Sequence, residues 1–305
     1  MNSKILNRRQ LLQGAALFGA GSLAANIGLA QTTATTMAAK PDIDVDVLNF
    51  ALNLEYLEAE FYLAAVGRKP SYKISGISSA SGAMGMGSNV IGGKKVKFSS
   101  NAFGRAAREY AEEIANDEEN HVKFLREALG DKAVARPTID IGPAFAAAAA
   151  AASKNAIKNF DPYANELFFL HGAFIFEDVG VTAYKGAAPL ITNPAYLEAA
   201  AGILSVEAYH AGIVRTLLYQ KRSTIAAAGL RVHQVVDAIS ALRDSVDGTA
   251  DSDQGVLIKN RANLVPTDAN GIAFSRTTTQ VLNIVYLGGK GKGGFFPNGL
   301  NGKIR

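Results

Sequence analysis

The sequence predicts an all-α fold, a four-helix bundle followed by an extra helix and an extended glycine-rich C-terminal tail. Three observations support this prediction. Four long segments carry apolar residues at three- and four-residue intervals. Two of them begin with a capping side chain followed by proline, at Asp161-Pro162 and Asn193-Pro194. The chain has 305 residues, of which 48% are hydrophobic and 19% charged, so it can bury a large core.

The four long segments define the helices of the bundle. We expect these helices at residues 44–66, 99–129, 161–185 and 193–222. Aspartate is the candidate cap of the first and the third, serine of the second and asparagine of the fourth. The helices make up a predicted bundle domain at residues 43–222.

Two connecting segments have distinctive compositions. Residues 67–98 are rich in glycine and serine, which predicts a long inserted loop or a small appended hairpin. The alanine run at 146–152 is compatible with an additional helix that has no side chains for chemistry. Neither segment carries a catalytic signature.

Residues 223–305 are predicted to pack on the bundle as a helix followed by a tail. An amphipathic pattern favours a helix at 232–245. The apolar run at 280–286 is typical of a strand. After the glycine-rich residues 287–294, the pair Phe295-Phe296 is expected to be buried against the bundle.

The first 30 residues have the pattern of a twin-arginine export signal. They combine Arg8 and Arg9 with a following apolar stretch rich in glycine and alanine. Small residues before Gln31 predict cleavage there, with residues 31–42 as a spacer. A membrane anchor is the alternative, but the apolar run is short and interrupted. We therefore expect a periplasmic or secreted protein without stable membrane insertion, and no later segment apolar for long enough to span a bilayer.

The composition excludes several kinds of site and partner. The chain has no cysteine, which excludes disulfides, thiolate metal sites and cysteine nucleophiles. Any metal must therefore bind to nitrogen and oxygen ligands. The formal net charge is +4, and Lys4, Arg8 and Arg9 of the signal supply three of these charges. Because the rest of the chain is nearly neutral, we expect no nucleic-acid partner.

Two histidines follow a glutamate at a spacing of three residues. Glu118 precedes His121 in the second predicted helix, and Glu207 precedes His210 in the fourth. Residues three apart share a helix face, so each pair can present its two side chains to one site. Two such pairs among only four histidines are not expected by chance.

Each of these helices follows a helix with a glutamate on an apolar face. Glu55 lies in the first helix and Glu177 in the third, and each has a tyrosine seven residues later, Tyr62 and Tyr184. The chain thus repeats one unit twice, a Glu helix and then a Glu-x-x-His helix. Glu58 shares the face of Glu55, but the internal repeat favours Glu55.

The repeated unit predicts a centre that holds two metal ions. Four carboxylates that converge on apolar faces would repel one another, and two divalent cations would balance their charge. This pattern matches the ligand rule of di-iron and di-manganese carboxylate bundles, and its ligands suit iron or manganese better than zinc. The predicted ligands are Glu55, Glu118, His121, Glu177, Glu207 and His210.

Neighbouring residues have simpler explanations. Asp117 and Glu119 flank the predicted ligands and either face solvent or support the ligands. His171 is expected to be a packed, hydrogen-bonded residue, and His233 lies outside the repeat. For Tyr62 and Tyr184, packing in the core and hydrogen bonding near the metals both remain open.

With these residues, the sequence resembles the ferritin-like superfamily, and within it exported bacterial ferritin-like domain proteins similar to plant desiccation-related proteins. The resemblance covers residues 43–222 through the six predicted ligands, and it extends to the tail at 271–277 and 293–299. It implies a ferritin-like bundle around two metal ions. It is less specific for an activity, because similar sites oxidise iron, dismute peroxide, activate oxygen or only hold metal.

We therefore expect redox chemistry on hydrogen peroxide or oxygen, catalase-like or ferroxidase-like, in stress protection. The expected partners are this small oxidant or a metal ion. A homodimer is a further expectation, because helical bundles of this kind often dimerise. The alternative is a non-catalytic desiccation or envelope stress protein whose metal site is structural or empty.

Overall fold

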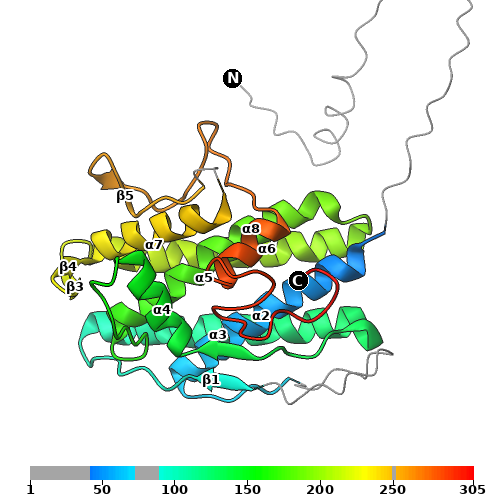
Figure 1. Cartoon of the computed structure of the whole chain (residues 1–305), viewed down its shortest axis with the longest axis horizontal. Helices are drawn as coiled ribbons and strands as arrows, with labels where there is room; N and C mark the ends of the chain where they lie inside the picture. Colours follow the sequence, from blue (N-terminus) through cyan, green and yellow to red (C-terminus); the bar gives the residue numbers. More distant parts are fainter. Residues whose placement is uncertain (1–41, 73–88, 249–251) are drawn as a thin grey trace, which may run out of the picture. The chain divides into compact units, whose positions relative to one another are not determined.

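The computed structural model describes residues 42–72, 89–248 and 252–305 (Figure 1). The predicted export signal at 1–30 and residues 31–41 of the spacer lie outside this part, as do residues 73–88 of the inserted loop. The predictions for these segments and the division into domains stay predictions.

Four long helices form the bundle, so the all-α prediction is confirmed. They are α2 (Asp44–Val66), α3 (Ala102–Leu129), α5 (Glu166–Ala187) and α6 (Pro194–Gln220). Helix α2 packs along α3 and helix α5 packs along α6, and smaller contacts join the two pairs (Figure 1). The arrangement brings together the two halves of the internal repeat.

Three asparagines cap helices of the bundle. The side chains of Asn101, Asn165 and Asn193 accept hydrogen bonds from the first backbone N–H groups of α3, α5 and α6, each at 2.9 Å. The predicted start of α5 at Asp161 is therefore wrong, because Asp161 caps a turn through the N–H of Tyr163 (3.1 Å). Helix α3 likewise begins after Asn101, and the Ser99 hydroxyl donates to Glu166 instead (2.5 Å).

The segment that follows the inserted loop joins the next connection as a strand. Strand β1 (Val90–Gly92) pairs in parallel with β2 (Ile139–Ile141), so its described part does not form a hairpin of its own. Gly92 has φ 81°, and a Cβ there would lie 2.6 Å from the backbone of Gly142. Glycine is thus required at this crossing. Short helix η1 (Gly130–Lys132) precedes β2, and α4 (Pro143–Ala152) confirms the extra helix in the alanine run.

The C-terminal part contains two further helices and two small hairpins. Helix α7 (Val232–Asp247) confirms the predicted extra helix. The strand predicted at 280–286 is wrong, because this segment forms α8 (Thr278–Val285). Its reciprocal hydrogen bonds between Thr277 and Gln280 form a capping box. The hairpins are β3 (Ile225–Ala227) with β4 (Leu230–Arg231), and β5 (Leu257–Ile258) with β6 (Arg261–Ala262), and η2 (Ala188–Leu190) extends α5.

A buried network of ion pairs attaches the tail to α5, α6 and α7. Asp178 of α5 accepts from Arg215 (2.8 Å) and from Arg243 (3.1 Å). Arg243 also lies 2.6 Å from Asp253, which pairs with Arg276. All five side chains are at most 8% exposed. Because each charge has a partner, the network can lie in the interior.

The phenylalanine pair of the tail packs into the core against α4 and α5. Phe295 and Phe296 are fully buried, as the sequence predicts. The ring of Phe295 contacts Phe145 of α4 and Phe176 of α5 at centroid distances of 5.1 and 4.9 Å. The tail is thus part of the hydrophobic core.

Among the residues that the structure describes, one helical region, Glu166–Leu190, is long and apolar enough to cross a membrane by length and composition. The prediction that no segment after the signal reaches this length is therefore wrong. Of its apolar window, 83% is buried inside the protein. A helix that is apolar on all sides and covered in this way is typical of the core of a bundle.

Candidate metal centre

The six residues selected from the sequence lie together in the middle of the bundle. Helices α2 and α5 each contribute one glutamate, and helices α3 and α6 each contribute a glutamate and a histidine one turn later. His121 is 9% exposed. The other five residues are at most 3% exposed: Glu55, Glu118, Glu177, Glu207 and His210. The cluster is therefore almost closed to bulk water.

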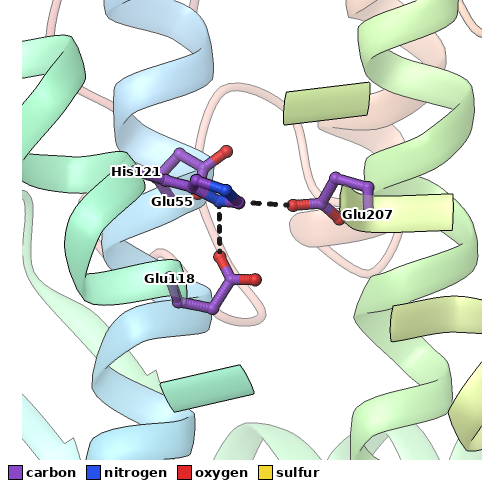
Figure 2. Close-up of side chains that lie close together, drawn as sticks. All are labelled: Glu55, Glu118, His121 and Glu207. Carbon is purple, nitrogen blue, oxygen red and sulfur yellow. Dashed lines mark hydrogen bonds and ion pairs between the residues drawn. The ribbon is translucent and has the colours of Figure 1, made fainter. Parts of the chain in front are cut away.

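One half of the cluster surrounds His121 (Figure 2). Its Nδ1 lies 3.2 Å from Glu55 Oε2, 3.5 Å from Glu118 Oε2 and 4.0 Å from Glu207 Oε1. One ligand atom from each of these four residues falls within 4.8 Å of all the others. The four side chains come from three helices and can hold one metal ion.

The other half of the cluster surrounds His210. Its Nδ1 lies 2.9 Å from Glu118 Oε1 and 3.6 Å from Glu177 Oε2, and these three residues form a second potential metal group. The ring centroids of His121 and His210 are 6.4 Å apart. Since Glu118 belongs to both groups, it lies where a carboxylate would bridge two ions.

The cluster contains polar atoms that the protein satisfies poorly. In the part of the chain that the structure describes, both oxygens of Glu118 and Glu207, Oε2 of Glu177 and Nδ1 of His210 are buried and make no hydrogen bond of good geometry, although His210 Nδ1 and Glu118 Oε1 lie within ion-pair distance. Each such atom costs about 1–3 kcal/mol, and native proteins contain few of them. Oxygen and nitrogen atoms of this kind are ligands of divalent metal ions, so the residues fit the predicted pair of ions.

Burial and neighbouring charges oppose each other in the cluster. Burial raises the pKa of Glu55 to about 7 and that of Glu177 to about 8. Burial also acts to raise the pKa of Glu118, but the two histidines close to its carboxylate outweigh burial and lower this pKa. Burial acts to lower the histidine pKa values, yet the glutamates raise them to about 11 for His121 and about 9 for His210. Bound cations would therefore replace protons held on the imidazoles.

The two tyrosines of the repeat make crossed hydrogen bonds. Tyr62 of α2 donates to Glu177 of α5, and Tyr184 of α5 donates to Glu55 of α2. Both tyrosines are buried. Each half of the repeat thus orients the glutamate of the other half, which decides the question that the sequence left open for these residues.

The acidic residues beside the Glu118 motif have different roles. Asp117 Oδ2 lies 3.1 Å from Nε2 of His210, so it orients that ring. Glu119 points away from the cluster and accepts from Arg68 and from Ser71. Only Asp117 therefore supports a predicted ligand.

Glu58 is a buried member of this region that the sequence ranks below Glu55. It is 5% exposed, and burial, followed by the charges of Glu118, Glu177 and Glu55, raises its pKa well above the usual value. Its position on the face of Glu55, one turn further along α2, is the signal in the sequence. It belongs to neither of the two groups described above.

The remaining histidines lie outside the cluster. His171 is 1% exposed, and its ring nitrogens face the carbonyls of Leu167 (2.6 Å) and Val232 (3.5 Å). The prediction of a packed, hydrogen-bonded residue is confirmed. His233 lies 3.7 Å from Asp237 on the same helix.

Comparisons with known proteins point in the same direction as this geometry. A family model described as the ferritin-like domain matches residues 43–220. The desiccation-related protein PCC13-62 of Craterostigma plantagineum is 31% identical over 255 residues, which are 79% of this chain and 77% of that protein. The ferritin-like catalase Nec2 of Nesocodon mauritianus is 25% identical over 283 residues, 86% of this chain and 85% of that protein. No solved structure gives a significant match.

Proposed function

Because the chain belongs to the ferritin-like domain family, we propose that it binds two iron or manganese ions in the buried cluster and uses them in redox chemistry on hydrogen peroxide or oxygen. The observation that carries the proposal is the set of buried, unsatisfied oxygen and nitrogen atoms that converge from four helices. Similarity to a protein named a ferritin-like catalase favours hydrogen peroxide as the oxidant.

The proposed ligands divide between the two ions. Glu55, Glu207 and His121 would hold one ion, Glu177 and His210 would hold the other, and Glu118, which belongs to both groups, would be shared by them. Paired iron or manganese ions, when bound, supply or accept two electrons together, which is what the disproportionation of peroxide to water and oxygen requires. The geometry allows ferroxidase chemistry as well, with Fe²⁺ as the substrate.

The protein's own residues orient the ligands and limit access. Tyr62 and Tyr184 hold Glu177 and Glu55 through their hydroxyl groups, and Asp117 holds the ring of His210. The side chain of His121 is 11% exposed, the largest value among the residues that surround it in the cluster. Because the cluster is almost fully buried, only a small molecule can reach it, which supports peroxide or oxygen as the substrate.

We also propose that the chain is exported before it acts. The basis is the twin-arginine pattern at residues 1–30, a route that carries folded and often cofactor-loaded proteins. Detection of the mature protein starting at Gln31 in a periplasmic or extracellular fraction tests this proposal. Full-length protein that remains in the cytoplasm contradicts it.

The second candidate function is a non-catalytic desiccation or envelope stress protein in which bound metal only stabilises the fold. It is favoured by the similarity to a desiccation-related protein at 31% identity. Under this alternative, the metal site contributes to stability and has no turnover.

Elemental analysis together with a peroxide assay tests both candidates. We expect close to two equivalents of iron or manganese in the wild type and almost none in the double variant Glu118→Ala/Glu207→Ala. Absence of transition metal after reconstitution refutes the metal centre. If the wild type consumes peroxide and Glu177→Ala abolishes this activity while the bundle stays folded, the enzyme is supported. If the wild type binds metal but never consumes peroxide, and Glu177→Ala only lowers the melting temperature, the stress-protein alternative is supported.

A further inference from the structure

The two halves of the repeat differ at one position next to the centre. When Glu55 is matched to Glu177, and Tyr62 to Tyr184, the counterpart of Glu58 is Gly180. The first half therefore places a carboxylate where the second half has no side chain. Other buried positions of the two helices differ as well, but position 58/180 lies directly beside the carboxylates of the centre.

Gly180 provides the space that the carboxylates on this side of the centre occupy. A Cβ at position 180 would lie 2.2 Å from Glu207 Oε2 and 3.5 Å from Glu58 Oε1. The two glutamates therefore approach the same point on the backbone of α5, and any larger residue there would collide with Glu207. The absence of a side chain at Gly180 therefore makes room for the carboxylates of both Glu58 and Glu207.

Glu58 has no counter-charge of its own. It is 5% exposed, and among the described residues no lysine, arginine or histidine lies within ion-pair distance of its carboxylate. By contrast, Glu60 on the same helix is paired with Arg136 and accepts from Tyr72. A buried carboxylate without a partner is expensive unless it takes up a proton or binds a cation.

We propose that Glu58 is a seventh ligand side chain of the centre, which adds a fifth carboxylate to the pair of metal ions. The inference rests on the proposed function. A cavity of about 20 Å³ lies against Glu58 and Gly180, so the packing beside this side chain is incomplete and leaves it some freedom to turn. Such movement is needed, because Glu58 lies outside the two groups of atoms that are within 4.8 Å of one another.

The contribution of Glu58 follows from the net charge of the ligands and the two ions. Four glutamates neutralise two divalent ions, whereas five leave one negative charge in excess. A fifth carboxylate thus stabilises the ions more strongly when one of them is trivalent. Glu58 should therefore strengthen metal binding and lower the reduction potential of the loaded centre.

The variant Glu58→Gln tests the inference, with Glu119→Gln as the matched control. Glu119 is also a buried carboxylate beside the centre, but it faces Arg68 and Ser71. Competition with a chelator measures the affinity for Mn²⁺, and a redox titration of the iron-loaded protein measures the midpoint potential. We expect the affinity for one of the two ions to fall by about tenfold or more in Glu58→Gln, with a more positive midpoint potential. The control should differ from wild type by less than about twofold.

The outcomes separate this inference from the proposed function. If the wild type binds two ions and Glu58→Gln matches the control in affinity and potential, Glu58 is not a ligand and the proposed function stands. If the wild type binds no transition metal, both are refuted. Far-ultraviolet circular dichroism of each variant before loading verifies that the bundle is folded.

Discussion

Removal of the proposed metal ions should strongly destabilise the bundle. Without ions, the cluster leaves buried atoms unsatisfied on Glu118, Glu177, Glu207 and His210. These are six atoms: two oxygens each of Glu118 and Glu207, one oxygen of Glu177 and one nitrogen of His210. At the lower cost of about 1 kcal/mol per atom, the penalty is about 6 kcal/mol. We use the lower cost because the two imidazolium groups offset part of the negative charge.

This penalty converts into a change of melting temperature. For a domain of this size, 1 kcal/mol corresponds to about 2–4 °C, so chelation should lower the melting temperature by at least about 12 °C. Differential scanning calorimetry of the loaded protein, the chelated protein and the reloaded protein measures this change. A difference of less than about 3 °C between loaded and chelated protein would refute the reasoning.

The variant Glu207→Gln sharpens the same prediction, because its effect should change sign with the metal. Burial and the neighbouring charges of Glu58 and Glu118 raise the pKa of Glu207 well above its usual value. A neutral amide therefore costs less than the carboxylate in the chelated protein, and the variant should melt later than the chelated wild type. In loaded protein it should melt earlier, since a proposed ligand is lost. The same sign in both states would contradict a metal-binding role.

Three further outcomes are expected. Burial lowers the pKa of His171 to about 4. Between about pH 6.5 and pH 4 the histidine is therefore protonated in the unfolded state but neutral in the folded state. Stability should fall by about 3 kcal/mol from pH 6.5 to pH 4, and urea unfolding of His171→Leu should lack that part of the slope; equal slopes would contradict it. Tyr184→Phe removes the hydrogen bond to Glu55 and should weaken Mn²⁺ binding about fivefold, whereas unchanged affinity would show that the bond is dispensable. Arg276→Met leaves the buried Asp247 without its arginine and removes one of the two arginine partners of Asp253, so it should cost about 3–5 kcal/mol in urea unfolding, against less than about 0.5 kcal/mol for the exposed control Lys290→Met.

The elements that the sequence predicts well are those with two independent signals. Helix α6 has both the apolar period and the pair Asn193-Pro194, and its start agrees with the prediction. The cluster is recognised because the repeat places the same residue types at the same spacing in both halves. Period and repeat are local properties, so they can be read from one sequence.

The wrong predictions concern segments whose sequence pattern is compatible with two different local structures. Residues 280–286 are too short to separate a strand from a helix by apolar pattern, and the capping box of Thr277 and Gln280 was the deciding feature. At Asp161-Pro162 the cap is used by a turn, and Asn165 caps α5 instead. Two candidate caps only a few residues apart cannot be ranked without the packing.

The features that the sequence does not reveal depend on distant contacts. Asp178 and Arg243 are 65 residues apart, and Thr182 and Arg276 are 94 apart, so no local pattern predicts the buried ion-pair network. Glu58 lies on the face that the sequence predicts, but its burial and its approach to Gly180 depend on contacts between helices that the sequence does not show.

The crossed tyrosine bonds bear on how a chain of this kind could originate. A single hairpin of α2 and α3 carries one Glu helix, one Glu-x-x-His helix and a tyrosine whose acceptor it does not contain. Two copies of such a hairpin, related by a twofold axis, would give each tyrosine the glutamate of the other copy and would complete both ion positions. The present chain has the contacts of that symmetric pair within one polypeptide, and this leaves each half free to change by itself, as at Glu58 and Gly180.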